Sequence, residues 1–160
     1  MYFKEEQKFR QWWLWLILIG LNLIPAYGIY KQIIRGQIFG DHPMSDVGLI
    51  SFQIFTLLFL VAFWAFKLVT EIDEDEIYIQ FYPLVKRSIS WSEVKTANMV
   101  NYGFVGGWGI RLTYKYGTVY NVNGDKGLLL ELENGKKVCI GTQKPEDLAE
   151  VAAYYQKGSS

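Results

Sequence analysis

Side chains that commonly carry out catalysis or bind metal ions are scarce in this sequence. Its 160 residues include one cysteine, Cys139, and one histidine, His42. A single thiol cannot form an internal disulfide, and two such residues cannot supply the ligand cluster of a zinc site. Their scarcity also argues against a cysteine–histidine nucleophile pair. We therefore expect a protein that is not an enzyme and that has no catalytic residues, no cofactor and no metal ion.

Two other patterns resemble functional motifs but lack the spacing that the chemistry requires. Residues 102–109 (YGFVGGWG) are rich in glycine, yet they contain no Gly-x-Gly-x-x-Gly and no Gly-Lys-Ser/Thr follows them. Glycines in such a setting more often permit a β-bulge or a close crossing of strands. The acidic residues between 71 and 76 do not have the spacing of a calcium-binding loop, so we expect a solvated turn. Neither pattern predicts a small-molecule substrate.

Charged residues are rare in the first part of the chain. Residues 1–70 contain 6 Lys and Arg and 4 Asp and Glu, whereas residues 71–160 contain 10 and 12. The first part includes two long uncharged segments, at about residues 12–30 and 47–66. As a helix, the first segment would span about 28 Å, close to the thickness of the hydrocarbon core of a bilayer. The two segments therefore predict an integral membrane protein with two transmembrane helices.

Aromatic and polar residues in the first segment support this interpretation. Trp12 and Trp13 lie at one end and Tyr27 and Tyr30 at the other, as in the aromatic belts of membrane helices. Asn22 needs a hydrogen-bonding partner in lipid, and we expect the second helix to supply it. The alternative is a pair of buried helices in a soluble protein. A domain of this size could not cover two uncharged helices of this length.

Basic residues near the two segments predict their orientation. The connector between the segments has only Lys31 and Arg35. The basic residues on the other side are Lys4, Lys8, Arg10, Lys67, Lys86 and Arg87. Lys and Arg are enriched in cytoplasmic flanks of membrane helices. We therefore expect a multi-pass protein of the cell inner (plasma) membrane with both termini in the cytoplasm.

From residue 71 onward, alternation of apolar and polar residues replaces continuous apolarity and predicts short strands. The predicted strands are residues 77–82, 87–91, 95–101, 109–116, 118–121, 127–132 and 137–140. Asn134 and Gly135 separate the last two. This dipeptide predicts a hairpin with a type I′ turn, in which both turn residues have positive φ.

A helix is predicted to follow the strands. Pro145 suits its first turn, and Leu148, Val151, Ala152 and Tyr155 recur at the spacing of one apolar helix face. The fold class is thus α+β, with a two-helix transmembrane hairpin followed by a bent antiparallel β-barrel or sandwich that the C-terminal helix caps. The predicted division is residues 1–69 for the membrane-anchoring hairpin, 70–156 for the β domain and 157–160 for a flexible tail.

Several motifs occur in an order that points to a known family. They are Ile-x-Trp-x-Glu-Val at residues 89–94, Gly-Trp-Gly-Ile-Arg at 107–111 and Gly-Thr-Gln-Lys-Pro-Glu at 141–146. With the two membrane segments, they resemble the bacterial pleckstrin-homology-like membrane proteins over about residues 70–156. The resemblance implies a seven-stranded, strongly bent sheet capped by the C-terminal helix. It does not imply an activity, because this fold hosts many unrelated binding roles.

Basic and aromatic residues of the β domain are candidates for contact with a partner or with lipid. They are Lys86, Arg87, Lys95, Trp108, Arg111 and Lys115. Trp108 would either fill the barrel or lie exposed at a partner surface. The basic side chains would attract anionic lipid head groups if they gathered on one face. No stripe of basic and aromatic residues predicts nucleic-acid binding. We expect binding of a partner protein or self-association at the membrane, with contact to anionic lipid head groups as the alternative.

Overall fold

The computed structural model describes residues 1–158 and divides the chain into two compact units. The helical unit consists of Arg10–Ala65. The β unit consists of Met1–Phe9 together with the chain from Phe66 onward.

Two long apolar helices make up most of the helical unit. They are α1 (Trp12–Ile29), which continues as the π-helical turn η1 (Tyr30–Ile34), and α2 (Asp46–Ala65). Both helices are long and apolar enough to cross a membrane. Most of their large side chains are exposed, whereas a core helix of a soluble protein would be covered. The two predicted helical segments are therefore confirmed, with ends within a few residues of those expected.

Polar side chains join the two helices near the middle of their length. Asn22 Nδ2 donates to the carbonyl oxygen of Thr56 at 3.2 Å, and Gln53 Nε2 donates to Asn22 Oδ1 at 3.2 Å. Such interhelical hydrogen bonds satisfy groups that lipid cannot. The expectation that α2 supplies the partner of Asn22 is confirmed.

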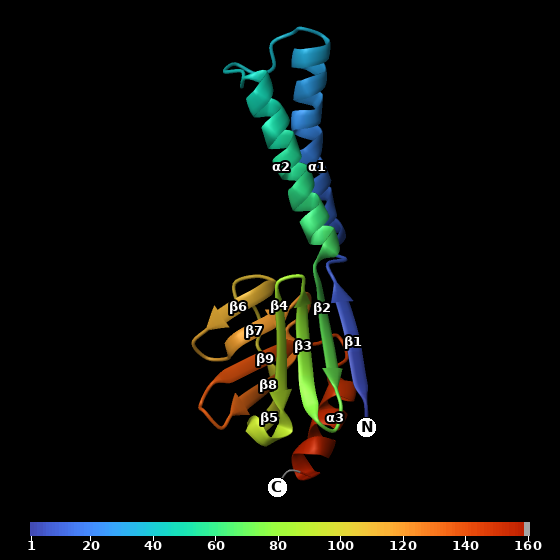
Figure 1. Ribbon diagram of the computed structural model, residues 1–160, viewed down its shortest axis with the longest axis vertical. Coiled ribbons are helices and arrows are strands. Elements are labelled where there is room, and N and C mark those ends of the chain that lie inside the picture. Colours follow the sequence, from blue (N-terminus) through green and yellow to red (C-terminus); the bar gives the residue numbers. More distant parts are fainter. Residues whose placement is uncertain (159–160) are drawn as a thin grey trace. The chain divides into compact units, whose positions relative to one another are not determined.

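The β unit contains two sheets (Figure 1). The first is antiparallel and has the order β1 (Phe3–Lys8), β2 (Lys67–Ile72), β3 (Glu76–Tyr82) and β4 (Val85–Ser90). A short 3₁₀ turn, η2 (Trp91–Glu93), leads into the second sheet.

The second sheet is mixed. Its order is β5 (Val94–Asn101), β8 (Lys126–Leu132), β9 (Lys137–Gly141), β7 (Gly117–Asn121) and β6 (Gly109–Thr113). β7 and β9 run parallel, and the other neighbours are antiparallel. The helix α3 (Pro145–Gly158) packs against β5, β8 and β1. The predicted α+β architecture with a C-terminal capping helix is thus observed.

The core of the β unit lies between the sheets and α3. Alternate residues of the strands point inward, for example Ile77, Ile79 and Phe81 of β3, all nearly fully buried. The predicted apolar face of α3 is also present. Leu148, Val151 and Ala152 are buried, and Tyr155 is half-buried. α3 continues to Gly158, past the predicted start of the tail, and residues 159–160 lie outside the described part of the chain.

Strands β1 and β2 are not among those predicted from the sequence. The predicted boundary placed residues 1–69 in the anchor, whereas Met1–Phe9 and Phe66 onward belong to the β unit. The sequence pattern did not predict β1 (FKEEQK), because two of its inward side chains, Glu5 and Gln7, are polar yet buried. The described residues therefore form nine strands, not the seven that the resemblance implies.

The turn between β8 and β9 also differs from the prediction. Gly135 has φ +80°, but Asn134 does not have positive φ, so the turn is not type I′. Instead, Asn134 Oδ1 accepts a hydrogen bond from the backbone N–H of Lys136 at 2.9 Å. The hairpin is present where it was predicted, with a side chain closing its turn.

Candidate interaction surface

An open groove lies between β4, the β6–β7 hairpin and the turn between β8 and β9. Its volume is about 360 Å³. The residues that line it are Arg87, Leu112, Thr113, Tyr114, Gly117, Thr118, Gly135, Lys136 and Lys137. We call it the basic groove, because three of these residues are cationic and none is acidic.

Two of the three cations in the basic groove have no partner. Within residues 1–158, neither Arg87 nor Lys136 forms an ion pair. Lys137 Nζ lies 2.9 Å from Glu131 Oε1, and this hydrogen bond holds the pKa of Glu131 below its ordinary value. The groove therefore offers uncompensated positive charge to an acidic group.

Apolar side chains are exposed beside these cations. Leu112 is 86% exposed and Tyr114 is fully exposed. Both belong to β6 or its following turn, and β6 is the outer strand of the second sheet. An outer strand leaves backbone N–H and C=O groups unpaired and can accept a further strand. The basic groove thus combines charge, exposed apolar area and an open sheet edge.

Strand β7 approaches β9 closely at the back of the basic groove. Gly117 has φ +66°, and a Cβ atom placed there would lie 2.1 Å from the carbonyl oxygen of Lys137. Only glycine permits this approach, which brings the β6–β7 hairpin alongside β9. The position of Leu112 and Tyr114 therefore depends on this one glycine.

The structure brings only some of the predicted contact residues together. Arg87 lines the basic groove, and Lys115 lies in the β6–β7 turn with its Nζ 5.0 Å from the centre of the Tyr116 ring. Arg111 lies on β6, where its guanidinium packs over Gly107: a Cβ atom on Gly107 would be 2.7 Å from Arg111 Nη2. Arg111 and Lys115 thus belong to the hairpin that borders the basic groove, but only Arg87 of the three is a lining residue.

The other three predicted residues lie elsewhere or are less accessible. Lys95 is on β5, at the opposite edge of the second sheet from β6. Four strand spacings, roughly 19 Å, separate those edges. Lys86 directly precedes Arg87 on β4. Successive side chains of a strand point to opposite faces, so Lys86 points away from the face that carries Arg87. Trp108 was predicted either to fill the barrel or to lie exposed, and its side chain is half-buried, which is intermediate between the two.

Sequence reasoning did not single out Leu112, Tyr114 or Lys136. Residues 109–116 were predicted as one strand of a barrel or sandwich, with no face of the strand assigned to Leu112. Leu112 is exposed because β6 is the outer strand of the second sheet formed by residues 1–158. Lys136 directly follows Gly135 of the predicted hairpin turn. Its position in the sequence could therefore have predicted a cation at this hairpin tip.

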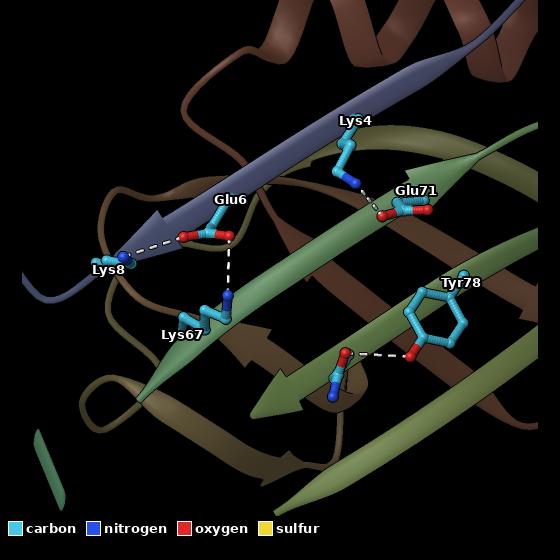
Figure 2. A network of polar contacts seen from close by, with 7 residues as sticks. Lys4, Glu6, Lys8, Lys67, Glu71 and Tyr78 are labelled. Atoms are coloured by element: carbon cyan, nitrogen blue, oxygen red, sulfur yellow. Dashed lines mark hydrogen bonds and ion pairs between the residues drawn. The ribbon is translucent and has the colours of Figure 1, made fainter. Parts of the chain in front are cut away.

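The outer face of the first sheet carries a network of ion pairs (Figure 2). Lys4 Nζ lies 2.6 Å from Glu71 Oε1. Glu6 contacts both Lys8, at 3.2 Å, and Lys67, at 3.0 Å. The bonds from these lysines keep the pKa of Glu6 below its ordinary value, Lys67 having the largest effect. Lys8 and Lys67 are therefore charge-compensated, unlike Arg87 and Lys136.

The remaining residues that could take part in catalysis or metal binding are buried, close a turn or lie in an exposed loop. Cys139 is fully buried, and burial raises the pKa of its thiol to about 12. Asp73 Oδ1 accepts hydrogen bonds from the backbone N–H groups of Asp75 and Glu76, both at 3.0 Å, and so closes the β2–β3 turn. His42 is exposed in the connector of the helical unit. Among residues 1–158, no three His, Cys, Asp or Glu side chains are grouped to hold a metal ion.

No family model matches the chain, and no curated protein matches it at a significant level.

Proposed function

We propose that this chain is a non-enzymatic integral membrane protein whose β unit binds another protein at the cytoplasmic face of the inner membrane. The basic groove is the observation that carries the proposal. Its exposed Leu112 and Tyr114 lie beside unpaired Arg87 on an open sheet edge. Protein interfaces are enriched in aromatic residues and arginine. The partner is either a copy of this chain or a component of a membrane complex.

The helical unit supports the membrane part of the proposal. α1 and α2 are long, apolar and largely uncovered. Lys8 and Lys67 are direct partners in the β1–β2 ladder, so the segment between them leaves and re-enters the β unit at the same place. Two membrane crossings satisfy this requirement, because an even number returns the chain to its starting side. The basic flanks favour the cytoplasm as that side.

The strand order supports the resemblance to the bacterial pleckstrin-homology-like proteins. β1–β4 form one antiparallel meander, and β5, β8 and β9 form a second. α3 follows the last strand and corresponds to the capping helix that the resemblance implies. β6 and β7 form a hairpin between β5 and β8 in the sequence, and β6 begins within the Gly-Trp-Gly-Ile-Arg segment at residues 107–111 that carries part of the resemblance. The hairpin with Leu112 and Tyr114 therefore belongs to the domain that resembles this family, and its exposed side chains are the proposed binding surface.

The proposal is tested by capturing the partner through the basic groove in cells. A photo-crosslinking amino acid at Leu112 should give one discrete product of higher mass, and the same label at exposed Glu150 of α3 should not. Tyr114→Ala should reduce the yield of this product at least several-fold. Tyr154→Ala, which truncates another exposed tyrosine, is the matched control and should leave the yield unchanged. Equal labelling from both positions, or no product, would contradict the proposal.

A second candidate function is contact of the basic groove with anionic lipid head groups. The unpaired cations Arg87 and Lys136 favour it. Hydrogen–deuterium exchange of the full chain in nanodiscs should then show slower exchange in β6 and the β8–β9 turn when anionic lipid replaces neutral lipid. Identical exchange in both lipids would remove this candidate and leave the protein partner.

A further inference from the structure

The turn between β3 and β4 lies at the end of the first sheet from which the chain continues into both helices. In the register of the sheet, Lys8 of β1 is opposite Lys67 of β2, which is opposite Tyr82 of β3. Lys8 is the last residue of β1 and Lys67 the first of β2. The turn that follows Tyr82 therefore shares one sheet end with the two connections to the helical unit.

Those connections are short. α2 ends at Ala65 and β2 begins at Lys67, so Phe66 alone joins them. On the other side, β1 ends at Lys8 and α1 begins at Trp12. One residue extends the chain by at most about 3.6 Å and three by about 11 Å. If the helices span a bilayer, this end of the first sheet is therefore held at the polar–apolar boundary of one leaflet.

The side chains of the β3–β4 turn suit that boundary. The turn is closed by a 2.8 Å hydrogen bond from the N–H of Leu84 to the carbonyl oxygen of Phe81. Leu84 at its tip is 61% exposed and Tyr82 is 44% exposed. Lys67 Nζ lies 6.0 Å from the centre of the Tyr82 ring. An exposed leucine, a tyrosine and neighbouring lysines are the composition of a segment that lies in the membrane interface.

The opposite end of the same sheet has the reverse character. The β2–β3 turn at that end contains Asp73, Glu74 and Asp75. It follows the last pair of the β2–β3 ladder, Ile72 and Ile77, which is farthest from Lys67 and Tyr82. An acidic turn is repelled by the negative surface of the cytoplasmic leaflet. The first sheet thus has an apolar and basic end at its connections to the helices and an acidic end away from them.

We propose that the β3–β4 turn is embedded in the bilayer, with Leu84 below the head groups and Tyr82 at their level. This inference rests on the proposed membrane anchoring and adds a third point of attachment, made by the β unit itself. It fixes which end of the first sheet faces the lipid. The acidic β2–β3 turn then faces the cytoplasm.

Membrane depth measured at three single cysteines tests the inference in the full chain. Cysteines replace Leu84 at the β3–β4 turn, Leu58 within α2 and Glu74 in the β2–β3 turn, all of them exposed positions. Native Cys139 can stay, because it is fully buried and we therefore expect no reaction with the nitroxide label at pH 7. Each labelled protein is reconstituted in vesicles that contain anionic lipid. Collision rates with oxygen, which partitions into lipid, and with a water-soluble nickel chelate report the depth.

The three positions separate the outcomes. We expect the ratio of oxygen to nickel collisions to be highest at position 58, intermediate at position 84 and several-fold lower at position 74. A label at position 84 as accessible to nickel as one at position 74, with position 58 still deep, overturns the embedded turn and leaves the membrane anchor intact. A label at position 58 that is also accessible to nickel overturns the membrane anchor and the inference together.

Discussion

Lys8 and Lys67 are directly opposite each other in the β1–β2 ladder, although the whole helical unit lies between them in the sequence. The first strand of the β unit thus precedes the helical unit in the sequence, and the remaining strands follow it. β1 is an integral part of the fold, because Phe3, Glu5 and Gln7 are all buried. The helical unit is consequently an insertion in a continuous antiparallel hairpin.

This insertion predicts that the helical unit can be removed without loss of the β unit. Continuing the ladder places Phe9 opposite Phe66, so an Asn-Gly turn between them would close an ordinary hairpin. We expect this joined β unit to be soluble without detergent, with a cooperative thermal transition by circular dichroism. The control is a fragment that begins at Phe66 and lacks β1. Equal stability of the fragment and the joined β unit would show that β1 is dispensable.

The sequence predicts those parts of the fold in which one physical signal dominates. α1 and α2 were predictable because apolar residues continue over a full membrane thickness, and α3 because Leu148, Val151 and Ala152 share a face. β1 was not, because its inward residues include Glu5 and Gln7, whose partners lie at the far end of the sequence. Local alternation cannot reveal a polar side chain that is satisfied by a distant segment.

The candidate site was predictable in part for a similar reason. Arg87 was one of the predicted contact residues, and it lies in the basic groove. Its neighbours there, Leu112 and Lys136, come from segments far away in the sequence. β7 pairs with β9 in parallel, although β8 separates them along the chain. Such a crossover has no local sequence signal, and so the composition of the groove could not be deduced before the topology was known.

Glu5 is expected to be the side chain through which β1 stabilises the C-terminal part of the β unit. Its carboxylate is buried and accepts hydrogen bonds from Thr142 Oγ1, at 2.6 Å, and from the backbone N–H of Gln143, at 2.9 Å. Glu5→Ala removes both bonds and leaves the two donors unpaired. Hydrogen bonds to charged groups contribute about 1.5–3 kcal/mol, and we expect a loss of stability of about that size. Urea unfolding of the joined β unit measures it.

Lys4→Ala is the control for Glu5→Ala on the neighbouring residue. Lys4 forms an exposed ion pair with Glu71, and such pairs contribute little to stability. We expect the urea midpoint to stay unchanged. A shift in this variant as large as that of Glu5→Ala would indicate that β1 acts through its pairing alone and not through the buried carboxylate.

Alanine substitutions at Gly117 and at Gly103 form a matched pair of variants that tests the close approach of β7 to β9. Both have positive φ, +66° and +59°, so alanine is strained at either position. A Cβ atom at Gly103 meets nothing within 4 Å, whereas one at Gly117 lies 2.1 Å from the carbonyl oxygen of Lys137. Gly103→Ala should cost about 1 kcal/mol from backbone strain. Gly117→Ala should cost a further 1–3 kcal/mol or so, because the backbone of β9 must move.

The same pair of variants connects the fold to the proposed binding surface. The β6–β7 hairpin that carries Leu112 and Tyr114 is positioned by the β7–β9 pairing. Gly117→Ala should therefore abolish the crosslink from position 112, while Gly103→Ala should keep it. An equal loss of stability in both variants would mean that the steric contact of the new Cβ atom with Lys137 is relieved without moving β9.

Alkaline conditions should destabilise the β unit through two buried acidic groups. Burial raises the pKa of the Cys139 thiol from 9.0 to about 12 and that of the Tyr102 hydroxyl from 10.0 to about 12. The folded protein therefore keeps protons that the unfolded chain releases. Below pH 9 this contribution to stability is fully present. As the pH rises from 9 toward 12, the unfolded chain binds fewer protons than the folded protein, and the free energy of unfolding must fall.

Cys139→Ala isolates the thiol in this pH dependence. The variant lacks the thiol, and with it both the proton that the unfolded chain releases above pH 9 and the effect of the thiolate on the pKa of Tyr102. Urea unfolding of the joined β unit between pH 8 and pH 10.5 should show that the parent loses stability more steeply than Cys139→Ala above pH 9, because one fewer group titrates in the unfolded variant. Parallel curves would mean that the thiol titrates alike in both states, and Cys139 would then have to be accessible to water in the folded protein. A thiol reagent at pH 8 gives the independent check, since we expect labelling of Cys139 only after unfolding.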